Sequence, residues 1–177
     1  MEAKKAIFAG GCFWCTQSEF DGVNGVLSAV SGYTGGWAET ANYPAVCTGQ
    51  TGHIEAVEIT YDKALVGYEA LLAIYWRHID PTDPSGQFAD RGSQYEAVIF
   101  YFDEEQKSQA EASKLALAKS GRFIKPLVTR IAPALPFYPA EENHQGYHCT
   151  NPGHYQRYRE GSGRQPFIRA HWPNESK

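Results

Sequence analysis

The sequence predicts an α+β fold: a single compact domain with a mixed sheet, flanking helices, long ordered loops and an irregular C-terminal tail. Three observations support this prediction. The 177 residues suffice for one domain with its own core and leave little room for two. Strand-like and helix-like segments are interspersed without strict alternation. Turn-forming residues fill two long stretches in the first hundred residues.

The first half of the chain alternates short strands with helices. The glycine pair Gly10-Gly11 ends the first strand, and helical spacing of apolar residues begins directly after it. An amphipathic helix later in this half ends at Asp80-Pro81, because the residue before proline avoids helical backbone angles. The predicted elements are a strand at 5–9, a helix at 12–21, a strand at 26–30, an ordered loop at 32–49, a strand at 54–62 and a helix at 68–79.

The second half is predicted with fewer elements. Asp103 caps a helix with Gln106 three residues further on, in the manner of a capping box, and Gly121 closes that helix. Prolines accumulate after Pro133. The predicted elements are a loop reaching residue 93, a strand at 95–102, the capped helix, a strand at 127–131, a short helical patch at 140–147 and an irregular tail at 153–177. One domain therefore spans residues 1–177.

Composition limits the classes of function. The net charge is −4, whereas nucleic-acid and membrane-surface proteins usually carry a basic patch, so we expect neither partner. The first apolar run is too short for a signal peptide, and no stretch approaches the roughly 18 apolar residues of a membrane span. We therefore expect a cytoplasmic protein, in which cysteines are reactive, metal-binding or inert thiols before they are disulfides.

Cys12 is the first candidate for reactivity. A strand, two glycines and a cysteine that opens a helix place the sulfur near free backbone amides and the positive end of the helix dipole. Both stabilise a thiolate, which is the nucleophilic form of cysteine. The competing interpretation is that Cys12 is a small buried apolar residue, as free cysteines often are.

Cys15 lies one helical turn from Cys12 in a C-x-x-C pair. Three interpretations compete: a redox dithiol, half of a zinc site, and coincidence. A zinc site needs two further well-spaced ligands; the sequence has no second C-x-x-C pair, and Cys47 and Cys149 are isolated from each other. On this segment alone, a thioredoxin-like dithiol remains open.

Glu55 is the candidate acid. It shares strand parity with Val57 and Ile59, so it faces inward if that parity marks the core side. A desolvated carboxyl group has a raised pKa and can donate a proton near neutral pH. The alternative is a core on the Ile54 side with Glu55 at a solvated strand end. The hydroxyls of Tyr43 and Tyr95 could bind a polar oxygen, although most tyrosines simply pack.

Taken together, several segments resemble the methionine sulfoxide reductase A family, the peptide-methionine (S)-S-oxide reductases. The matching segments follow one another in the family's order over about residues 5–152. They are residues 11–14, 32–36, 43 with 46–47, 51–57, 80–82, 90–95 and 137–145.

The resemblance implies roles for residues in these segments. Cys12 would attack the sulfur of methionine S-sulfoxide, free or in proteins, while Glu55 protonates its oxygen. Tyr43 and Tyr95 would hydrogen-bond that oxygen. Two aromatic residues, Phe13 and Trp14, would form the apolar wall for the substrate methyl group. Asp90 would help to hold the site through a backbone amide or a water molecule.

The resemblance also implies how Cys12 is restored. The sulfenic acid left on Cys12 would condense with a second thiol, and thioredoxin or dithiothreitol would reduce the resulting disulfide. The family usually has glycine where this chain has Cys15, and it commonly carries recycling cysteines in a tail that here holds none after Cys149. The resolving thiol is therefore Cys15, Cys149 or both in relay, with a slight preference for Cys15. We expect no bound cofactor, no metal and a monomer, and we interpret Cys47 as structural.

Two other functions remain as alternatives. A general dithiol–disulfide oxidoreductase would use Cys12 and Cys15 but leaves Glu55, Tyr43 and Tyr95 without roles. A zinc-stabilised interaction domain would need two further ligands, and the sequence has no second C-x-x-C pair to supply them.

Overall fold

A six-stranded sheet forms the centre of the molecule, with strand order β7-β6-β1-β3-β2-β8. The computed structural model describes residues 1–175. A separate two-stranded hairpin joins β4 to β5. The strands are β1 (Ala3–Gly10), β2 (Val26–Thr34), β3 (Ile54–Asp62), β4 (Gly86–Gln87), β5 (Asp90–Arg91), β6 (Ala97–Tyr101), β7 (Arg130–Pro133) and β8 (Phe137–Pro139).

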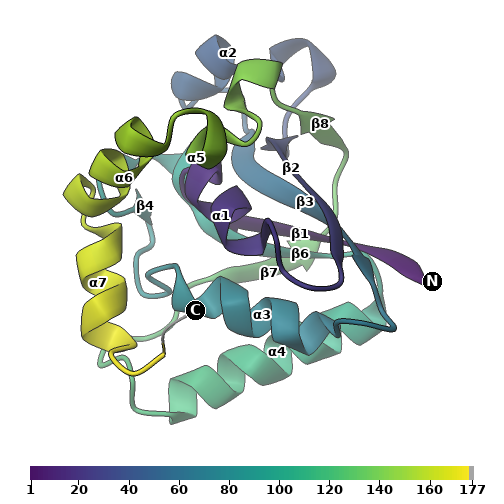
Figure 1. Cartoon of the computed structure of the whole chain (residues 1–177), viewed down its shortest axis with the longest axis vertical. Helices are drawn as coiled ribbons and strands as arrows, with labels where there is room; N and C mark the ends of the chain where they lie inside the picture. The colour runs from purple at the N-terminus through teal and green to yellow at the C-terminus, as the bar shows by residue number, and fades with distance from the viewer. Residues whose placement is uncertain (176–177) are drawn as a thin grey trace.

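Helices cover one face of the sheet (Figure 1). The apolar residues of α1 and α3 form one large core with the sheet residues of matching parity, Phe8, Val57 and Ile59 among them. The helices are α1 (Phe13–Phe20), α2 (Tyr43–Cys47), α3 (Tyr68–Arg77), α4 (Glu104–Lys119), α5 (Tyr147–Thr150), α6 (Pro152–Gly161) and α7 (Arg164–His171), with short 3₁₀ turns η1 (Ala38–Thr40), η2 (Ser93–Tyr95) and η3 (Glu142–His144). In the described part of the chain no helix is long and apolar enough to cross a membrane.

The sheet is mixed, as predicted. β1 lies between β3 and β6 and is antiparallel to both, β2 is antiparallel to β3 and β8, and only β6 and β7 run parallel. The opposite face of the sheet is also covered, by a smaller cluster that includes Ile54 and Ala56. Because both faces of β3 are buried near its start, the apolar Ile54 and the inward Glu55 do not exclude each other.

Several predicted elements match the structure closely. The strand at 54–62 and the helix after Asp103 are confirmed. Asp103 accepts a hydrogen bond from the Gln106 amide at 2.8 Å, and the Gln106 side chain accepts one from the Phe102 amide at 2.9 Å. These two bonds satisfy amides that the first helical turn leaves free. Gly121 follows the helix in the left-handed region, at φ 74°.

Other predicted elements are displaced. The strand predicted at 127–131 lies at Arg130–Pro133, because the Val128 amide is bound to the Pro81 carbonyl at 2.7 Å and is not free for the sheet. The strand predicted from residue 95 begins at Ala97, after the η2 turn. The long loop predicted at 32–49 is shorter, since β2 continues to Thr34 and α2 forms within it.

The prediction of an irregular tail at 153–177 is wrong. Two helices, α6 and α7, occupy most of it, while residues 176–177 lie outside the described part. Pro152 stands at the start of α6, where its fixed φ suits a helix and its missing amide costs nothing. Figure 1 shows α5 and α6 beside α1, so the C-terminal region lies next to the first cysteines of the chain.

Candidate active site

Cys12 lies between β1 and α1, at the N-cap position of the helix. Gly11 before it has φ 84°, a left-handed conformation that favours glycine, and a β-carbon there would come within 2.6 Å of the Gln87 side chain. The turn therefore requires glycine on both conformational and steric grounds. It leaves the Cys12 side chain 7% exposed.

Glu55 reaches the start of the same helix from β3. Its Oε2 accepts the Phe13 amide at 3.0 Å, and the residue is 2% exposed. Burial raises the pKa of Glu55 to about 8, although the Phe13 hydrogen bond favours the ionised form. The inward orientation expected from strand parity is confirmed, and the carboxyl group is largely protonated at neutral pH.

The thiols of Cys12 and Cys15 are shifted in opposite directions. Burial is the main reason that the pKa of Cys12 is raised well above its usual value, and the contact with Cys15 and the nearby carboxyl groups add to it. The pKa of Cys15 is lowered to about 6, chiefly because the Cys12 thiol donates a hydrogen bond to it and also because two arginines of α6 and α7 lie near. The anion thus belongs on Cys15 in the substrate-free protein.

This distribution corrects the sequence-based expectation for Cys12. A thiolate was expected there because a helix start offers free amides and a favourable dipole. In the structure the Phe13 amide is bound to Glu55, and α1 is only eight residues long. Burial beside carboxyl groups then outweighs the remaining contribution of the helix.

The hydroxyls of Tyr43 and Tyr95 belong to the same group of residues. Tyr43 begins α2 and Tyr95 ends η2. Burial is the main reason that the pKa of each is raised; the contact with Cys47 adds to it at Tyr43, and the nearby Glu55 side chain adds to it at Tyr95. Both hydroxyls therefore stay protonated and can donate hydrogen bonds. The Tyr43 amide is bound to Glu141 at 2.9 Å, which fixes the start of α2.

Phe13 and Trp14 have different surroundings. Phe13 is buried in the core, with its ring 5.7 Å from Tyr33. Trp14 is partly buried: its ring stacks on Tyr147 at 3.8 Å, and its Nε1 donates to the His144 Nδ1 at 3.2 Å. The more accessible apolar surface beside Cys12 therefore comes from Trp14.

Asp90 is held in a way the sequence did not predict. The Tyr158 hydroxyl of α6 donates a hydrogen bond to its Oδ2. The Tyr158 ring also meets Trp14 edge-on at 5.8 Å. Asp90 contributes to the raised pKa of Cys12 and of Glu55, so the structure brings Asp90 to the candidate site.

Comparison with known proteins identifies the family. The family model for peptide methionine sulfoxide reductase matches residues 4–176. The chain belongs to this family. It is 56% identical to the peptide methionine sulfoxide reductase MsrA of Bacillus subtilis (strain 168) over 174 residues, which cover 97% of this chain and 98% of that protein. The MsrA of Listeria monocytogenes serotype 4a (strain HCC23) is 54% identical, with 96% of each chain covered.

Solved structures agree with this family fold. Mxr1 from Saccharomyces cerevisiae in its reduced form superposes with a TM-score of 0.78 at 28% identity, covering 86% of this chain and 87% of that one. Methionine sulfoxide reductase A of Corynebacterium diphtheriae gives a TM-score of 0.74 at 28% identity, covering 85% and 76% of the two chains. The family resemblance drawn from the sequence is therefore confirmed.

Sequence reasoning missed the contributions of the C-terminal helices to this family site. Tyr158 and Tyr147 contact Trp14, and Glu141 accepts the Tyr33 hydroxyl at 2.8 Å. The sequence does contain a signal for a helix after Pro152. Tyr155 lies three positions after Pro152, and Tyr158 and Arg159 lie three and four positions after Tyr155, which places these side chains on one side of a helix. The segment's low apolar content concealed that pattern.

The two remaining cysteines are exposed, and the Cys47 thiol lies against the Tyr43 hydroxyl. Cys47 is exposed at the end of α2, and Cys149 is exposed in α5. Cys149 lies with His148 and Asp21, and their ligand atoms come within 4.8 Å of one another. Within residues 1–175 this is the only such cluster, and it contains neither Cys12 nor Cys15. A zinc site built on the C-x-x-C pair thus lacks further ligands among the described residues.

Proposed function

We propose that the protein reduces methionine S-sulfoxide, free or within proteins, to methionine, with Cys12 as nucleophile and Glu55 as acid. One observation carries the proposal: a buried, largely protonated carboxyl group binds the first amide of the helix that begins beside Cys12. A sulfoxide oxygen leaves poorly until it is protonated. A nucleophilic sulfur beside a protonated acid is what that chemistry requires.

In the first step the Cys12 sulfur attacks the sulfoxide sulfur. The Glu55 proton moves to the sulfoxide oxygen, and the Cys12 proton passes along its hydrogen bond to Cys15. The sulfur–oxygen bond of the substrate breaks, the hydroxyl ends on Cys12 as a sulfenic acid, and methionine leaves. The substrate sulfur is reduced and the Cys12 sulfur is oxidised, while Glu55 is left ionised.

Substrate orientation rests on groups around the two reacting residues. Tyr43 and Tyr95 donate hydrogen bonds to the sulfoxide oxygen, and their raised pKa values support the donor role. Trp14 and Phe13 provide the apolar wall for the methyl group, and Asp90 supports the site through Tyr158. Because the sulfoxide oxygen and the methyl group of the substrate each have a fixed position, only one sulfoxide epimer can present its sulfur to Cys12.

Cys15 is the resolving thiol in this proposal. It is hydrogen-bonded to Cys12. Cys149 instead lies beside Asp21, whose Oδ2 is 3.1 Å from the His148 Nε2. Asp21 follows α1, so eight helical residues, or roughly 12 Å, separate Cys149 from the Cys12 end of the helix. A disulfide requires α-carbons within about 7 Å, which favours Cys15.

An external thiol then restores the enzyme. Thioredoxin or dithiothreitol reduces the Cys12–Cys15 disulfide by thiol exchange, without a bound cofactor. Yeast Mxr1, which this chain resembles, has also been solved in complex with Trx2. We further propose a cytoplasmic monomer, for which size-exclusion chromatography and cell fractionation are the tests.

The proposal is tested with separated S and R epimers of dabsyl-methionine sulfoxide in dithiothreitol. We expect turnover of the S epimer only, loss of turnover in Cys12→Ser, and near wild-type turnover in the matched control Cys47→Ser. Reduction of both epimers at equal rates, or activity in Cys12→Ser, would contradict it. Disulfide reduction in insulin without sulfoxide turnover would instead support the general dithiol–disulfide oxidoreductase.

A further inference from the structure

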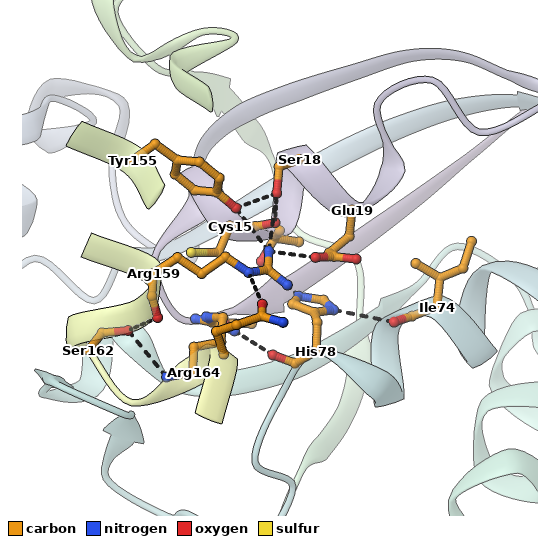
Figure 2. A network of polar contacts seen from close by, with 12 residues as sticks. Cys15, Ser18, Glu19, Ile74, His78, Tyr155, Arg159, Ser162 and Arg164 are labelled. Atoms are coloured by element: carbon orange, nitrogen blue, oxygen red, sulfur yellow. Dashed lines mark hydrogen bonds and ion pairs between the residues drawn. The ribbon is translucent and has the colours of Figure 1, made fainter. Parts of the chain in front are cut away.

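Two arginines of the C-terminal helices lie against the C-x-x-C turn, and the reaction above does not use them. Figure 2 shows the Cys15 side chain among Tyr155 and Arg159 of α6 and Arg164 of α7. These residues come from the tail, more than 130 positions further along the chain. Their position behind the dithiol suggests a role in how it reacts.

Arg164 is a buried cation. It is 1% exposed, and its guanidinium donates to the carbonyl oxygens of His78 at 2.6 Å and Gly10 at 2.9 Å. Both acceptors are neutral, and burying a charge is costly unless an anion compensates it. The His78 imidazole is no anion, and burial lowers its pKa to about 3, so it stays neutral. Gly10 belongs to the turn that leads to the two cysteines.

Arg159 approaches from α6. Its Nη1 lies 2.6 Å from the Glu19 carboxylate and donates to the Tyr155 hydroxyl at 2.9 Å. The Tyr155 hydroxyl is 2.5 Å from the Ser18 Oγ and also lies against the Cys15 thiol. Glu19 and Tyr155 thus fix the guanidinium of Arg159 close to Cys15.

Charged and titratable groups surround Cys15 on every side. At the start of α1 and on it they are Cys12 and Glu19; on α6 Tyr155, Tyr158 and Arg159; on α7 Arg164; on β3, further away, Glu55; and after α3 the neutral His78. Both arginines lower the pKa of Cys15, and Glu19 is already paired with Arg159. The net effect of these neighbours favours an anion on Cys15.

We propose that Arg159 and Arg164 are positioning residues that hold Cys15 as a thiolate and so extend the resolving step to acidic pH. The inference rests on the proposed function, in which Cys15 resolves the sulfenic acid. Cys15 gives up to solvent the proton that it received from Cys12, and its thiolate attacks the Cys12 sulfur. The S–S bond forms as the S–O bond breaks, and the hydroxide takes up the released proton and leaves as water. Cys15 is oxidised and the sulfenic sulfur is reduced.

The pH dependence of the resolving step separates this role from a purely structural one. A thiolate of higher pKa is scarcer at low pH but intrinsically more nucleophilic. Loss of an arginine should therefore change disulfide formation little at pH 8 and slow it severalfold at about pH 6. A packing defect would instead slow disulfide formation by a similar factor at both pH values.

The experiment measures disulfide formation after one equivalent of S-sulfoxide, as a function of pH. In Arg159→Gln we expect the midpoint to rise by about one pH unit or more, and Arg159→Lys to restore most of the shift. Arg157→Gln, an exposed arginine on the same helix, is the matched control and should keep the wild-type midpoint. Ultraviolet titration of thiolate in a Cys12→Ser variant lacking Cys47 and Cys149 should show the same rise for Cys15.

An unchanged midpoint in Arg159→Gln would overturn the inference, and so would an equal shift in Arg157→Gln. Arg164→Gln extends the test if it folds; if it does not, Arg159→Gln decides. Methionine release by the wild-type protein tests the proposed function separately. Release with no wild-type disulfide between Cys12 and Cys15 would remove Cys15 as the resolving thiol, without bearing on sulfoxide reduction.

Discussion

The two ends of one helical turn carry thiols in opposite environments. Cys12 faces the carboxyl groups of Glu55 and Asp90, and its pKa is raised. Cys15, one turn later, accepts the hydrogen bond of Cys12 and lies near Arg159 and Arg164, and its pKa falls to about 6. The comparison teaches that a C-x-x-C pair need not have two equivalent thiols. The side of the turn that faces the sheet holds the carboxyl groups, and we call it the acid side. The side that faces the C-terminal helices holds the arginines beside Cys15, and we call it the thiolate side.

Removing the Cys15 thiol should have the largest effect on thioredoxin-driven turnover. In Cys15→Ser we expect one equivalent of methionine per enzyme and then almost no thioredoxin-driven turnover, because the sulfenic acid on Cys12 lacks a partner. A burst assay with thioredoxin measures this. If Cys149→Ser shows the burst and Cys15→Ser cycles normally, the roles of the two cysteines are exchanged.

Removing the acid should have the next largest effect. Glu55→Gln is nearly isosteric but cannot protonate the sulfoxide oxygen, so the sulfoxide-reduction step should slow by about 10² to 10⁴-fold. Single-turnover release of methionine measures that step. Glu58→Gln on the same strand, whose partner is Lys5 at 2.9 Å, is the control and should react normally. An unaltered rate in Glu55→Gln would remove its assigned role.

The acid side also predicts a pH profile. Burial raises the pKa of Glu55 to about 8, and the proposed mechanism requires the protonated form. The single-turnover rate should therefore fall by about tenfold for each unit above that pH. It should also decrease below about pH 6, where Cys15 is itself protonated and cannot take the Cys12 proton. In Glu55→Gln the fall at about pH 8 should disappear. Persistence of the same fall in the variant would assign it to another group.

The smallest predicted effect concerns the hydrogen bond by which Tyr158 of α6 contacts Asp90. Tyr158→Phe removes the hydroxyl that α6 donates to Asp90, and a lost hydrogen bond to a charged group costs about 1.5–3 kcal/mol. We expect a lower Tm and a severalfold loss of kcat/KM, with Tyr101→Phe on β6 as the control. Calorimetry and steady-state kinetics measure the two effects. A wild-type Tm together with wild-type kcat/KM would show that this contact is dispensable.

The sheet side of the site could be largely predicted from the sequence. Strand parity placed Glu55 on the core face, and the glycine pair located the turn before Cys12, because both signals are local. The protonation state of Cys12 was not predictable. It depends on Glu55 taking the Phe13 amide, a contact between residues 42 positions apart.

The C-terminal side could not be predicted in the same way. Residues of α6 and α7 are mostly polar, and although α7 is amphipathic, the low apolar content of both segments concealed the helices. The helices depend instead on tertiary polar contacts, such as Arg164 with Gly10 and Tyr158 with Asp90. Such contacts between distant positions leave no regular spacing in the sequence.

The division of labour between Cys12 and Cys15 is tested most directly by mapping the disulfide after one turnover. The reduced protein receives one equivalent of S-sulfoxide without reductant, free thiols are alkylated, and the chain is cleaved before Asp21. Fragment 1–20 then contains Cys12 and Cys15 and neither of the other cysteines. We predict this fragment unalkylated and internally cross-linked. Fragment 1–20 joined to the peptide that carries Cys149, or still carrying alkylated Cys15, would contradict the account.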